Sequence, residues 1–309
     1  MARYFDPPED YRPGLAFQLR ERKEGGDLQP EVRQSPPLDP FARIEALVLI
    51  HGFNNHYGEA GVAYHGFRLR QYGRAVPQLI PPALEEMLAD LFWPGDAAWG
   101  IFDLMDFLVY PGAVGTAKNA APRLARHLRA MPTLRIVHFL AHSLGCRIAL
   151  ETIDNLRRKG GPVVGKVCLM AAAVPVFMVQ SGGRLADAME HAGEVRILHS
   201  DDDAVLRYAF PPGQTVATGN EGFFPAALGL HRPPPMVVGR VDPIDIDNAG
   251  HGDYWGHSRR PSASIAADRI ADFFRFGSWE RTLAARTPGA APRTSTAETR
   301  ELGHARVIR

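Results

Sequence analysis

Cysteine is scarce in this chain: only two of its 309 residues are cysteines, and both Cys146 and Cys168 lie inside apolar runs. A free cysteine in such a run behaves as a small core residue. Two cysteines form neither a disulfide framework nor a zinc site, which needs more ligands at closer spacing. The scarcity therefore favours a protein of a reducing compartment and gives no indication of a structural metal.

Long apolar runs are absent as well. No stretch approaches the roughly 18 uninterrupted apolar residues that a membrane-spanning helix needs. The N-terminal residues 1–14 contain no apolar segment of the kind found in secretory signals. We therefore predict a cytoplasmic protein with neither a transmembrane segment nor a signal peptide.

An excess of one charge is also missing, because 35 Lys and Arg stand against 34 Asp and Glu. Proteins that bind nucleic acid normally carry a clear basic excess, so we expect no nucleic-acid partner. Hydrophobic residues make up 45% of the chain and charged residues 22%. These values are ordinary for a globular protein and exclude wholesale disorder.

What the sequence does contain is a series of short apolar runs, which are typical of strands covered on both faces. They cover residues 46–50, 134–140, 163–170, 195–199 and, more weakly, 241–246. Segments that favour helices lie between and after these runs, at residues 118–131, 146–158, 185–192 and 262–276. The alternation predicts an α/β fold with a mostly parallel, doubly wound sheet and helices on both of its faces.

The two ends of the chain differ from this central part. Residues 14–20 alternate apolar and polar side chains, and a short run at 31–33 follows a Gly-Gly-Asp turn. We therefore predict that the extension 1–40 adds an antiparallel hairpin to the sheet of a main domain, residues 41–280. Residues 281–309 show no hydrophobic periodicity, which predicts a flexible tail.

The connection 206–239 is long, rich in proline and glycine, and partly apolar. Long irregular segments of this kind often form a lid or a pocket wall rather than a plain surface loop. We expect its residues Phe223, Phe224, Leu228 and Leu230 either to cover a substrate pocket, which Phe223 and Phe224 would line, or to belong to the core.

Residues 141–145, Ala-His-Ser-Leu-Gly, stand between a predicted buried strand and a predicted helix. A sharp turn at this place holds the backbone of Ser143 in a strained conformation and lifts its hydroxyl above the sheet edge. Small residues are needed at both ends because larger side chains would collide across the turn, and Ala141 stands where glycine is usual. The pattern predicts Ser143 as a nucleophile.

A serine hydroxyl needs a general base, and the base needs an orienting carboxylate. Asp201, Asp202 and Asp203 directly follow a predicted strand and offer this carboxylate; alternatively, they form a solvated turn that caps a helix. His251 lies after the last predicted strand and before the last helix, where the base is expected. His257, six residues later, is the competing candidate.

An oxyanion that develops during acyl transfer needs two backbone N–H donors. Leu144 follows the nucleophile at a helix start, and Phe53 lies in the His-Gly-Phe turn that ends the strand 46–50. We expect the N–H groups of these two residues to form the oxyanion hole. His51 and His142 flank the two turns, where each either lines the substrate pocket or only packs and hydrogen-bonds.

Together these motifs resemble the α/β-hydrolase superfamily over residues 41–276. The forms Leu-Ile-His-Gly-Phe-Asn-Asn at 49–55, Phe-Trp-Pro-Gly at 92–95 and the Ala-His-Ser-Leu-Gly turn are similar to a bacterial branch of uncharacterised serine hydrolases with esterase- or lipase-like motifs. The resemblance implies the fold, a Ser-Asp-His triad in that chain order and hydrolysis of an ester, thioester or amide. In this family an apolar residue commonly follows the acid by three positions; Val205 does so relative to Asp202, which implies Asp202 as the acid.

Two patterns resemble metal sites without meeting their requirements. Residues 245–250 begin like a calcium loop, but its twelfth position is Gly256, which supplies no bidentate carboxylate. His251, Asp253 and His257 are ligand types at a spacing that is not specific. We therefore predict no metal and no cofactor, a small-molecule acyl substrate, and a carboxylesterase- or lipase-like serine hydrolase. The alternatives are an acyltransferase on the same triad and a non-catalytic binding or scaffold protein.

Overall fold

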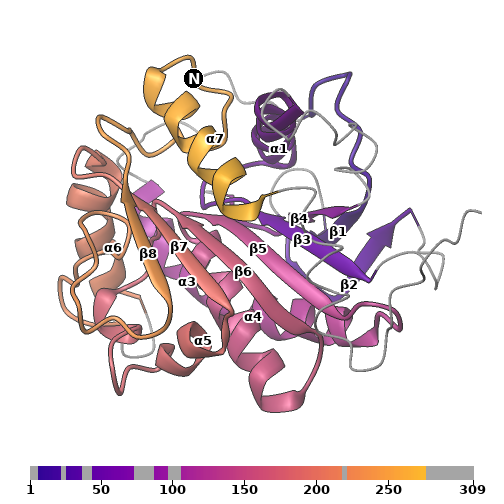
Figure 1. The fold of residues 1–309 in the computed structure, drawn as a ribbon, viewed down its shortest axis with the longest axis horizontal. Helices are drawn as coiled ribbons and strands as arrows, with labels where there is room; N and C mark the ends of the chain where they lie inside the picture. The colour runs from indigo at the N-terminus through magenta and orange to yellow at the C-terminus, as the bar shows by residue number, and fades with distance from the viewer. Residues whose placement is uncertain are drawn as a thin grey trace, which may run out of the picture.

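The computed structural model describes residues 6–21, 26–36, 44–72, 87–96, 106–217 and 221–275. The predicted tail at 281–309 lies outside the described residues. One sheet of eight strands runs through the described part, in the order β2-β1-β4-β3-β5-β6-β7-β8 (Figure 1). The strands are β1 (Ala16–Arg20), β2 (Leu28–Ser35), β3 (Glu45–Ile50), β4 (Leu88–Phe92), β5 (Ile136–His142), β6 (Val163–Met170), β7 (Glu194–His199) and β8 (Val241–Asp245).

The pairing of the strands confirms the predicted sheet. β1 and β2 pair in antiparallel fashion, and all other neighbours in the sheet, from β1–β4 to β7–β8, pair in parallel. The five predicted strands are present within two residues of the predicted bounds. Every residue of the central strand β5 is buried, because a parallel strand is covered by helices on both sides.

β4 is a central strand that the sequence analysis did not predict. All five of its residues are buried between β1 and β3. Asp90 interrupts the apolar run, which hides the strand from a pattern search. Its carboxylate is fully buried, accepts a hydrogen bond from the Tyr11 hydroxyl, and pairs with the Arg68 guanidinium at 3.0 Å. The interior charge is tolerated because it is paired and hydrogen-bonded.

Helices cover both faces of the sheet. The helices are α1 (Tyr57–Tyr72), α3 (Asp106–Ala130), α4 (Gly145–Lys159), α5 (Ala186–His191), α6 (Phe210–Thr215) and α7 (Pro261–Phe274), with short helical turns η1 (Val176–Met178) and η2 (Val205–Ala209). α3 begins twelve residues before the predicted start at 118, because Pro111, which signals a helix break in sequence, lies within it. In the described ranges, the helices are all too short or too polar to cross a membrane.

Each face of the sheet has its own hydrophobic core. Val48 and Ile50 of β3 face the core with α3, α4 and α5, whereas the alternate residues Leu47 and Leu49 face the core with α1 and α7. Figure 1 shows α1 and α7 on one side of the sheet and α4 and α5 on the other. This two-sided arrangement confirms the predicted doubly wound fold and brings the carboxyl ends of β3, β5, β7 and β8 to one edge.

Candidate active site

The turn after β5 has the geometry of a nucleophile elbow. Ser143 lies between β5 and α4 with φ 54°, a left-handed conformation that is strained for a residue with a side chain. Gly145 is needed because a Cβ atom there would lie 2.4 Å from the carbonyl oxygen of His51. The close approach of α4 to the end of β3 therefore fixes where the Ser143 hydroxyl emerges.

Ser143, His251 and Asp203 form a continuous hydrogen-bonded chain. The Nε2 atom of His251 lies 2.8 Å from the Ser143 Oγ atom, and its Nδ1 atom lies 2.8 Å from Oδ2 of Asp203. The Asp203 side chain is fully buried, and that of His251 is 20% exposed. The elbow after β5, the loop after β7 and the loop after β8 thus meet at one edge of the sheet, although their residues lie far apart in the sequence.

The expectation of Asp202 as the partner of the histidine is wrong in this geometry. Asp202 is exposed, and Asp201 is also exposed, with its carboxylate 2.7 Å from Nδ1 of His231. The turn after β7 directs only the third aspartate inward. Leu206, three residues after Asp203, is fully buried, whereas Val205, three residues after Asp202, is 45% exposed. Both Asp202 and Asp203 are followed after three positions by an apolar residue, so this spacing does not distinguish them. Only Asp203 and its apolar residue Leu206 are buried.

Asp203 also combines two roles that the sequence presented as alternatives. Its Oδ1 atom accepts a hydrogen bond of 3.0 Å from the backbone N–H of Leu206, at the start of η2. Its Oδ2 atom faces His251. One aspartate can therefore hold the start of η2 and the imidazole at the same time, because a carboxylate accepts at both oxygens.

The competing histidine lies elsewhere. His257 is placed beside α1, where a Cβ atom at Gly66 would lie 2.7 Å from the backbone nitrogen of His257. Gly66, the residue against which His257 lies, belongs to α1, on the face of the sheet that α1 and α7 cover. The structure therefore brings His251, and not His257, to the serine.

The two turns expected to hold an oxyanion lie against each other. A Cβ atom at Gly52 would lie 2.8 Å from the Cβ atom of Ser143, so only glycine allows the turn after β3 to come this close. In the part of the chain that the structure describes, the backbone N–H groups of Phe53 and Leu144 donate to no protein acceptor. The next residue, Asn54, donates to the carbonyl of Gly95 at 2.6 Å and holds the turn in place.

His51 is a structural part of this turn. It is fully buried and stacks on Trp93 with ring centroids 5.5 Å apart. Its Nε2 atom accepts from the Trp93 backbone N–H at 3.3 Å, and its Nδ1 atom donates to the Gly52 carbonyl at 2.9 Å. Burial lowers its pKa to about 3, so the ring stays neutral. Of the two roles left open for His51, packing and hydrogen bonding is the one observed.

Residues 38–210, more than half of the chain, match the family described as alpha/beta hydrolase of unknown function (DUF900). The chain belongs to this alpha/beta hydrolase family. It is similar to an esterase from Pyrobaculum calidifontis at 15% identity and TM-score 0.44, covering 77% of this chain and 78% of that one.

Two further solved structures are similar to this hydrolase. One is the esterase domain of a Rhodothermus marinus protein, at 13% identity and TM-score 0.38, with 77% of this chain and 89% of that one covered. The other is Est1E from Butyrivibrio proteoclasticus with bound ferulic acid, at 10% identity and TM-score 0.39, with 75% and 90% covered. The comparison with curated proteins found no match.

The loop that carries His251, residues 246–262, is called the base loop below. Asp253 holds it together by accepting hydrogen bonds from the Gly250 N–H at 2.8 Å and from the hydroxyls of Ser258 at 2.7 Å and Ser262 at 3.1 Å. Burial raises the pKa of Asp253, but these hydrogen bonds outweigh burial and leave the pKa below its usual value. Sequence reasoning considered Asp253 only as a metal ligand and missed this role.

A second loop of the hydrolase is held by a buried ion cluster that the sequence analysis also missed. We call residues 210–217 and 221–225 the rim segment. Glu221 has a fully buried side chain and accepts a two-pronged contact from Arg147 at 2.9 and 3.0 Å. Lys118 of α3 contacts it at 3.1 Å and Gln214 at 2.6 Å. The rim segment is thereby tied to α4, the helix that follows Ser143.

The apolar residues of the connection 206–239 separate into two groups. Leu228 and Leu230 are buried, whereas Phe223 is 82% exposed and Phe224 is 57% exposed. The two phenyl rings pack on each other with centroids 5.0 Å apart, and Phe224 has φ 44°. We expected this connection to cover a pocket and hide both phenylalanines, and their exposure shows that this expectation is wrong. The alternative, that these residues belong to the core, is correct for the two leucines alone.

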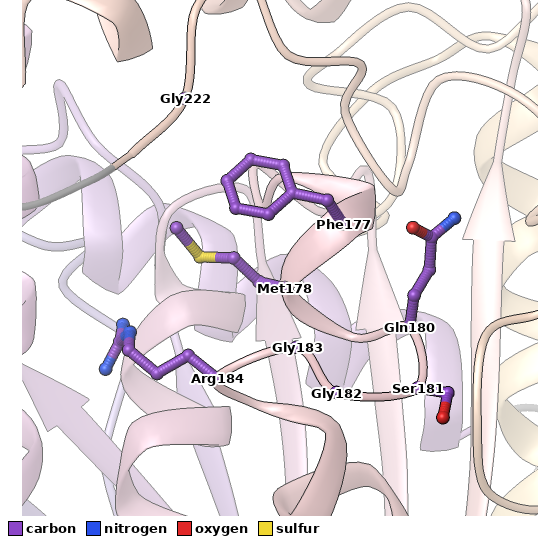
Figure 2. Close-up of a pocket in the computed structure, with 8 residues that line it drawn as sticks. All are labelled: Phe177, Met178, Gln180, Ser181, Gly182, Gly183, Arg184 and Gly222. Atoms are coloured by element: carbon purple, nitrogen blue, oxygen red, sulfur yellow. The ribbon is translucent and has the colours of Figure 1, made fainter.

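A surface depression of about 520 Å³ lies beside the rim segment (Figure 2). Figure 2 shows Phe177 and Met178 at its centre, Arg184 on one side, and Gln180 and Ser181 on the other. Ser143, Asp203 and His251 are not among the residues that line it. The depression is therefore separate from the hydrogen-bonded chain described above.

The described residues contain no group of three or more His, Cys, Asp or Glu arranged to hold a metal ion. Cys146 and Cys168 are both buried as free thiols. Burial raises the pKa of Cys168 to about 12, so this thiol is protonated and unreactive at neutral pH. The prediction that no metal or cofactor takes part stays a prediction.

Proposed function

We propose that this chain is a serine hydrolase that cleaves a carboxylic ester, or a thioester or amide, through an acyl-enzyme on Ser143. The observation that carries the proposal is the chain of two 2.8 Å contacts from Ser143 through His251 to Asp203. A hydroxyl placed on a strained elbow and next to an oriented imidazole is the arrangement that activates a serine.

In the first half of the reaction, Nε2 of His251 takes the Ser143 proton while Oγ forms a bond to the substrate carbonyl carbon. Asp203 accepts from Nδ1–H, which keeps Nε2 free as the proton acceptor and stabilises the imidazolium that forms. The carbonyl oxygen becomes an oxyanion, for which the N–H groups of Phe53 and Leu144 are the proposed donors. His251 then gives its proton to the leaving alcohol, thiol or amine as the bond to it breaks.

In the second half, a water molecule replaces the leaving group. The oxygen of this water attacks the acyl carbon while His251 takes a proton from it, and the same two N–H groups hold the second oxyanion. When this intermediate breaks down, His251 returns the proton to Ser143 Oγ and the carboxylic acid leaves. The serine is thereby regenerated without any other group changing its charge.

The test is labelling of the full chain with a fluorophosphonate probe, together with hydrolysis of p-nitrophenyl esters of increasing chain length. We expect the probe to modify Ser143 and the esters to be hydrolysed. Ser143→Ala should abolish both, with a loss of roughly 10⁶-fold in kcat and an unchanged melting temperature, because alanine fits the same turn. A wild-type protein that neither reacts with the probe nor hydrolyses any ester would support a binding or scaffold role instead.

Adding alcohol acceptors to the same assay separates hydrolysis from acyl transfer. We expect water to remain the main acceptor, so that free acid accumulates in proportion to p-nitrophenol. Ester formation that outpaces acid formation would assign the same triad to an acyltransferase.

A further inference from the structure

His142 connects the nucleophile turn to the base loop. It is the last residue of β5 and the neighbour of Ser143, and its side chain is buried. Its Nε2 atom lies 2.7 Å from the backbone carbonyl oxygen of His251, and the two rings lie 4.9 Å apart between centroids. One short contact therefore links the residue before the nucleophile to the backbone of the residue that carries the base.

The direction of this hydrogen bond follows from the chemistry of its acceptor. A carbonyl oxygen only accepts, so Nε2 of His142 carries the proton and Nδ1 carries the lone pair. Burial, together with the nearby His251, lowers the pKa of His142 well below its usual value. The ring is thus a neutral, single donor with a fixed tautomer.

His251 needs such an anchor because its backbone is flanked by Gly250 and Gly252, which give the chain wide conformational freedom. In the part of the chain that the structure describes, the bond from His142 is the one hydrogen bond that the backbone of His251 makes. Asp253 fixes the loop at Gly250, one residue away. His142 fixes it at the base itself.

The ring of His142 is itself held in place on several sides. A Cβ atom at Gly52 would lie 3.0 Å from Nδ1 of His142, so the oxyanion turn closes over one edge of the ring. Tyr254 and Trp255 of the base loop lie 6.0 and 6.1 Å away between ring centroids. These neighbours and the hydrogen bond to the His251 carbonyl hold the ring between the turn at Ser143 and the base loop.

We propose, on the basis of the function proposed above, that His142 is a positioning residue for His251. Its Nε2–H bond to the His251 carbonyl holds the imidazole between Ser143 Oγ and Asp203 Oδ2, so that proton transfer from the serine needs no rearrangement. His142 neither contacts the acyl carbon nor exchanges protons during the reaction.

The test compares two side chains of similar length in the full-length protein. In His142→Gln the amide nitrogen takes the place of Nε2 and still donates, whereas His142→Met fills similar space without a donor. We expect His142→Met to lower kcat by about 10- to 100-fold, since a displacement of about 1 Å can cost 10²-fold. KM should change by less than about threefold, and His142→Gln should keep most of the wild-type kcat.

The comparison of the two variants distinguishes positioning from simple packing. If His142 only fills space, glutamine and methionine should replace it equally well or equally badly. A kcat that is retained in His142→Gln and lost in His142→Met, with KM nearly unchanged in both, shows that the hydrogen bond to the His251 carbonyl is what matters. Equal losses of kcat in both variants would overturn the proposal and leave His142 as a packing residue.

A measurement on the wild-type protein does not depend on either variant folding. ¹⁵N NMR of the histidine rings should show His142 as the neutral Nε2–H tautomer, and a proton on Nδ1 instead would overturn the proposal. If Ser143 reacts with the probe in the wild type and His142→Met reacts at the same rate, this inference fails while the proposed function stands. An unreactive wild type overturns both.

Discussion

The base loop and the rim segment are each held by a buried carboxylate of their own, but the groups that donate hydrogen bonds to the two carboxylates differ. In the base loop, Asp253 accepts from a backbone N–H and two serine hydroxyls, and its one cationic contact, Arg260 at 3.3 Å, is largely exposed. In the rim segment, Glu221 accepts from the fully buried guanidinium of Arg147 and from Lys118. Mostly neutral donors therefore hold the loop that carries His251. In the rim segment, the buried Arg147 and the partly exposed Lys118 add two cations to the neutral donor Gln214.

Because of this difference, we expect changes in the two loops to affect different properties: the stability of the fold in one case and the rate of turnover in the other. Removing the Glu221 carboxylate leaves the buried Arg147 with only Glu151 as a counter-charge, which is costly for the whole fold. Removing a carboxylate from neutral donors leaves unsatisfied N–H and O–H groups, which costs less. The base loop, however, places Nε2 of His251 2.8 Å from Ser143 Oγ, so a small displacement of this loop would affect the proposed reaction directly. We therefore expect Glu221 to govern unfolding and the base loop with its partner Asp203 to govern turnover.

The largest expected effect is on turnover. Asp203→Asn should lower kcat by about 10⁴-fold, because the amide turned toward Nδ1 favours the wrong tautomer of His251. The fold should be retained, since the amide oxygen can still accept from Leu206. Steady-state kinetics and the rate of probe labelling measure the loss.

Asp202→Asn is the matched control, because Asp202 is exposed and makes no contact with His251. It should leave kcat close to the wild-type value. A large loss in Asp202→Asn and a small one in Asp203→Asn would reverse the assignment.

The next effect is on stability. Glu221→Gln should lower the free energy of unfolding by about 3 kcal/mol, because the buried Arg147 loses its two-pronged partner and keeps only Glu151 as a counter-charge. Urea titration followed by circular dichroism measures it. Asp187→Asn, which removes the 59% exposed partner of a surface ion pair with Arg157, should change stability by less than about 1 kcal/mol. A similar small change in Glu221→Gln would contradict the role given to the buried cluster.

Asp253→Asn should cost less, about 1–3 kcal/mol, because the donors around it are mostly neutral. The pKa of Asp253 is depressed below its usual 3.8, so its contribution is present above pH 3.8 and is lost as the pH falls through the lower, folded value. The gap in melting temperature between wild type and Asp253→Asn should therefore narrow below that pH. Asp247→Asn, at an exposed aspartate of the same loop, should change stability by less than about 0.5 kcal/mol.

The smallest effect is expected at the tip of the rim segment. Phe223→Ala should change stability by about 0.5 kcal/mol or less, because the side chain is 82% exposed. It should also leave the chain-length profile of ester hydrolysis unchanged. Leu228→Ala, in the buried part of the same connection, should cost about 2–5 kcal/mol. A shifted chain-length profile in Phe223→Ala would return this residue to the substrate pocket.

Much of the site could be placed from the sequence because its positions follow from strand ends. Ser143 directly follows β5, and His251 lies six residues after the end of β8. Parallel strands bring positions at their carboxyl ends to one edge of the sheet. Strand β4 was missed because Asp90 breaks its pattern. That aspartate is acceptable only because Tyr11 and Arg68, distant in sequence, come to it in the fold.

By itself, then, the sequence determined the alternation of strands and helices, the sharp turn at Ser143, and the placement of the aspartates 201–203 and of His251 after later strands. These features depend on local pattern and chain direction. The tertiary structure alone decided that Asp203 rather than Asp202 meets His251, because which side of a turn is buried depends on the strands packed against it. It also decided the partnerships of Glu221 with Arg147 and of His142 with the His251 carbonyl. These contacts join residues that are 48 to 109 positions apart, and only the folded chain brings them within hydrogen-bonding distance.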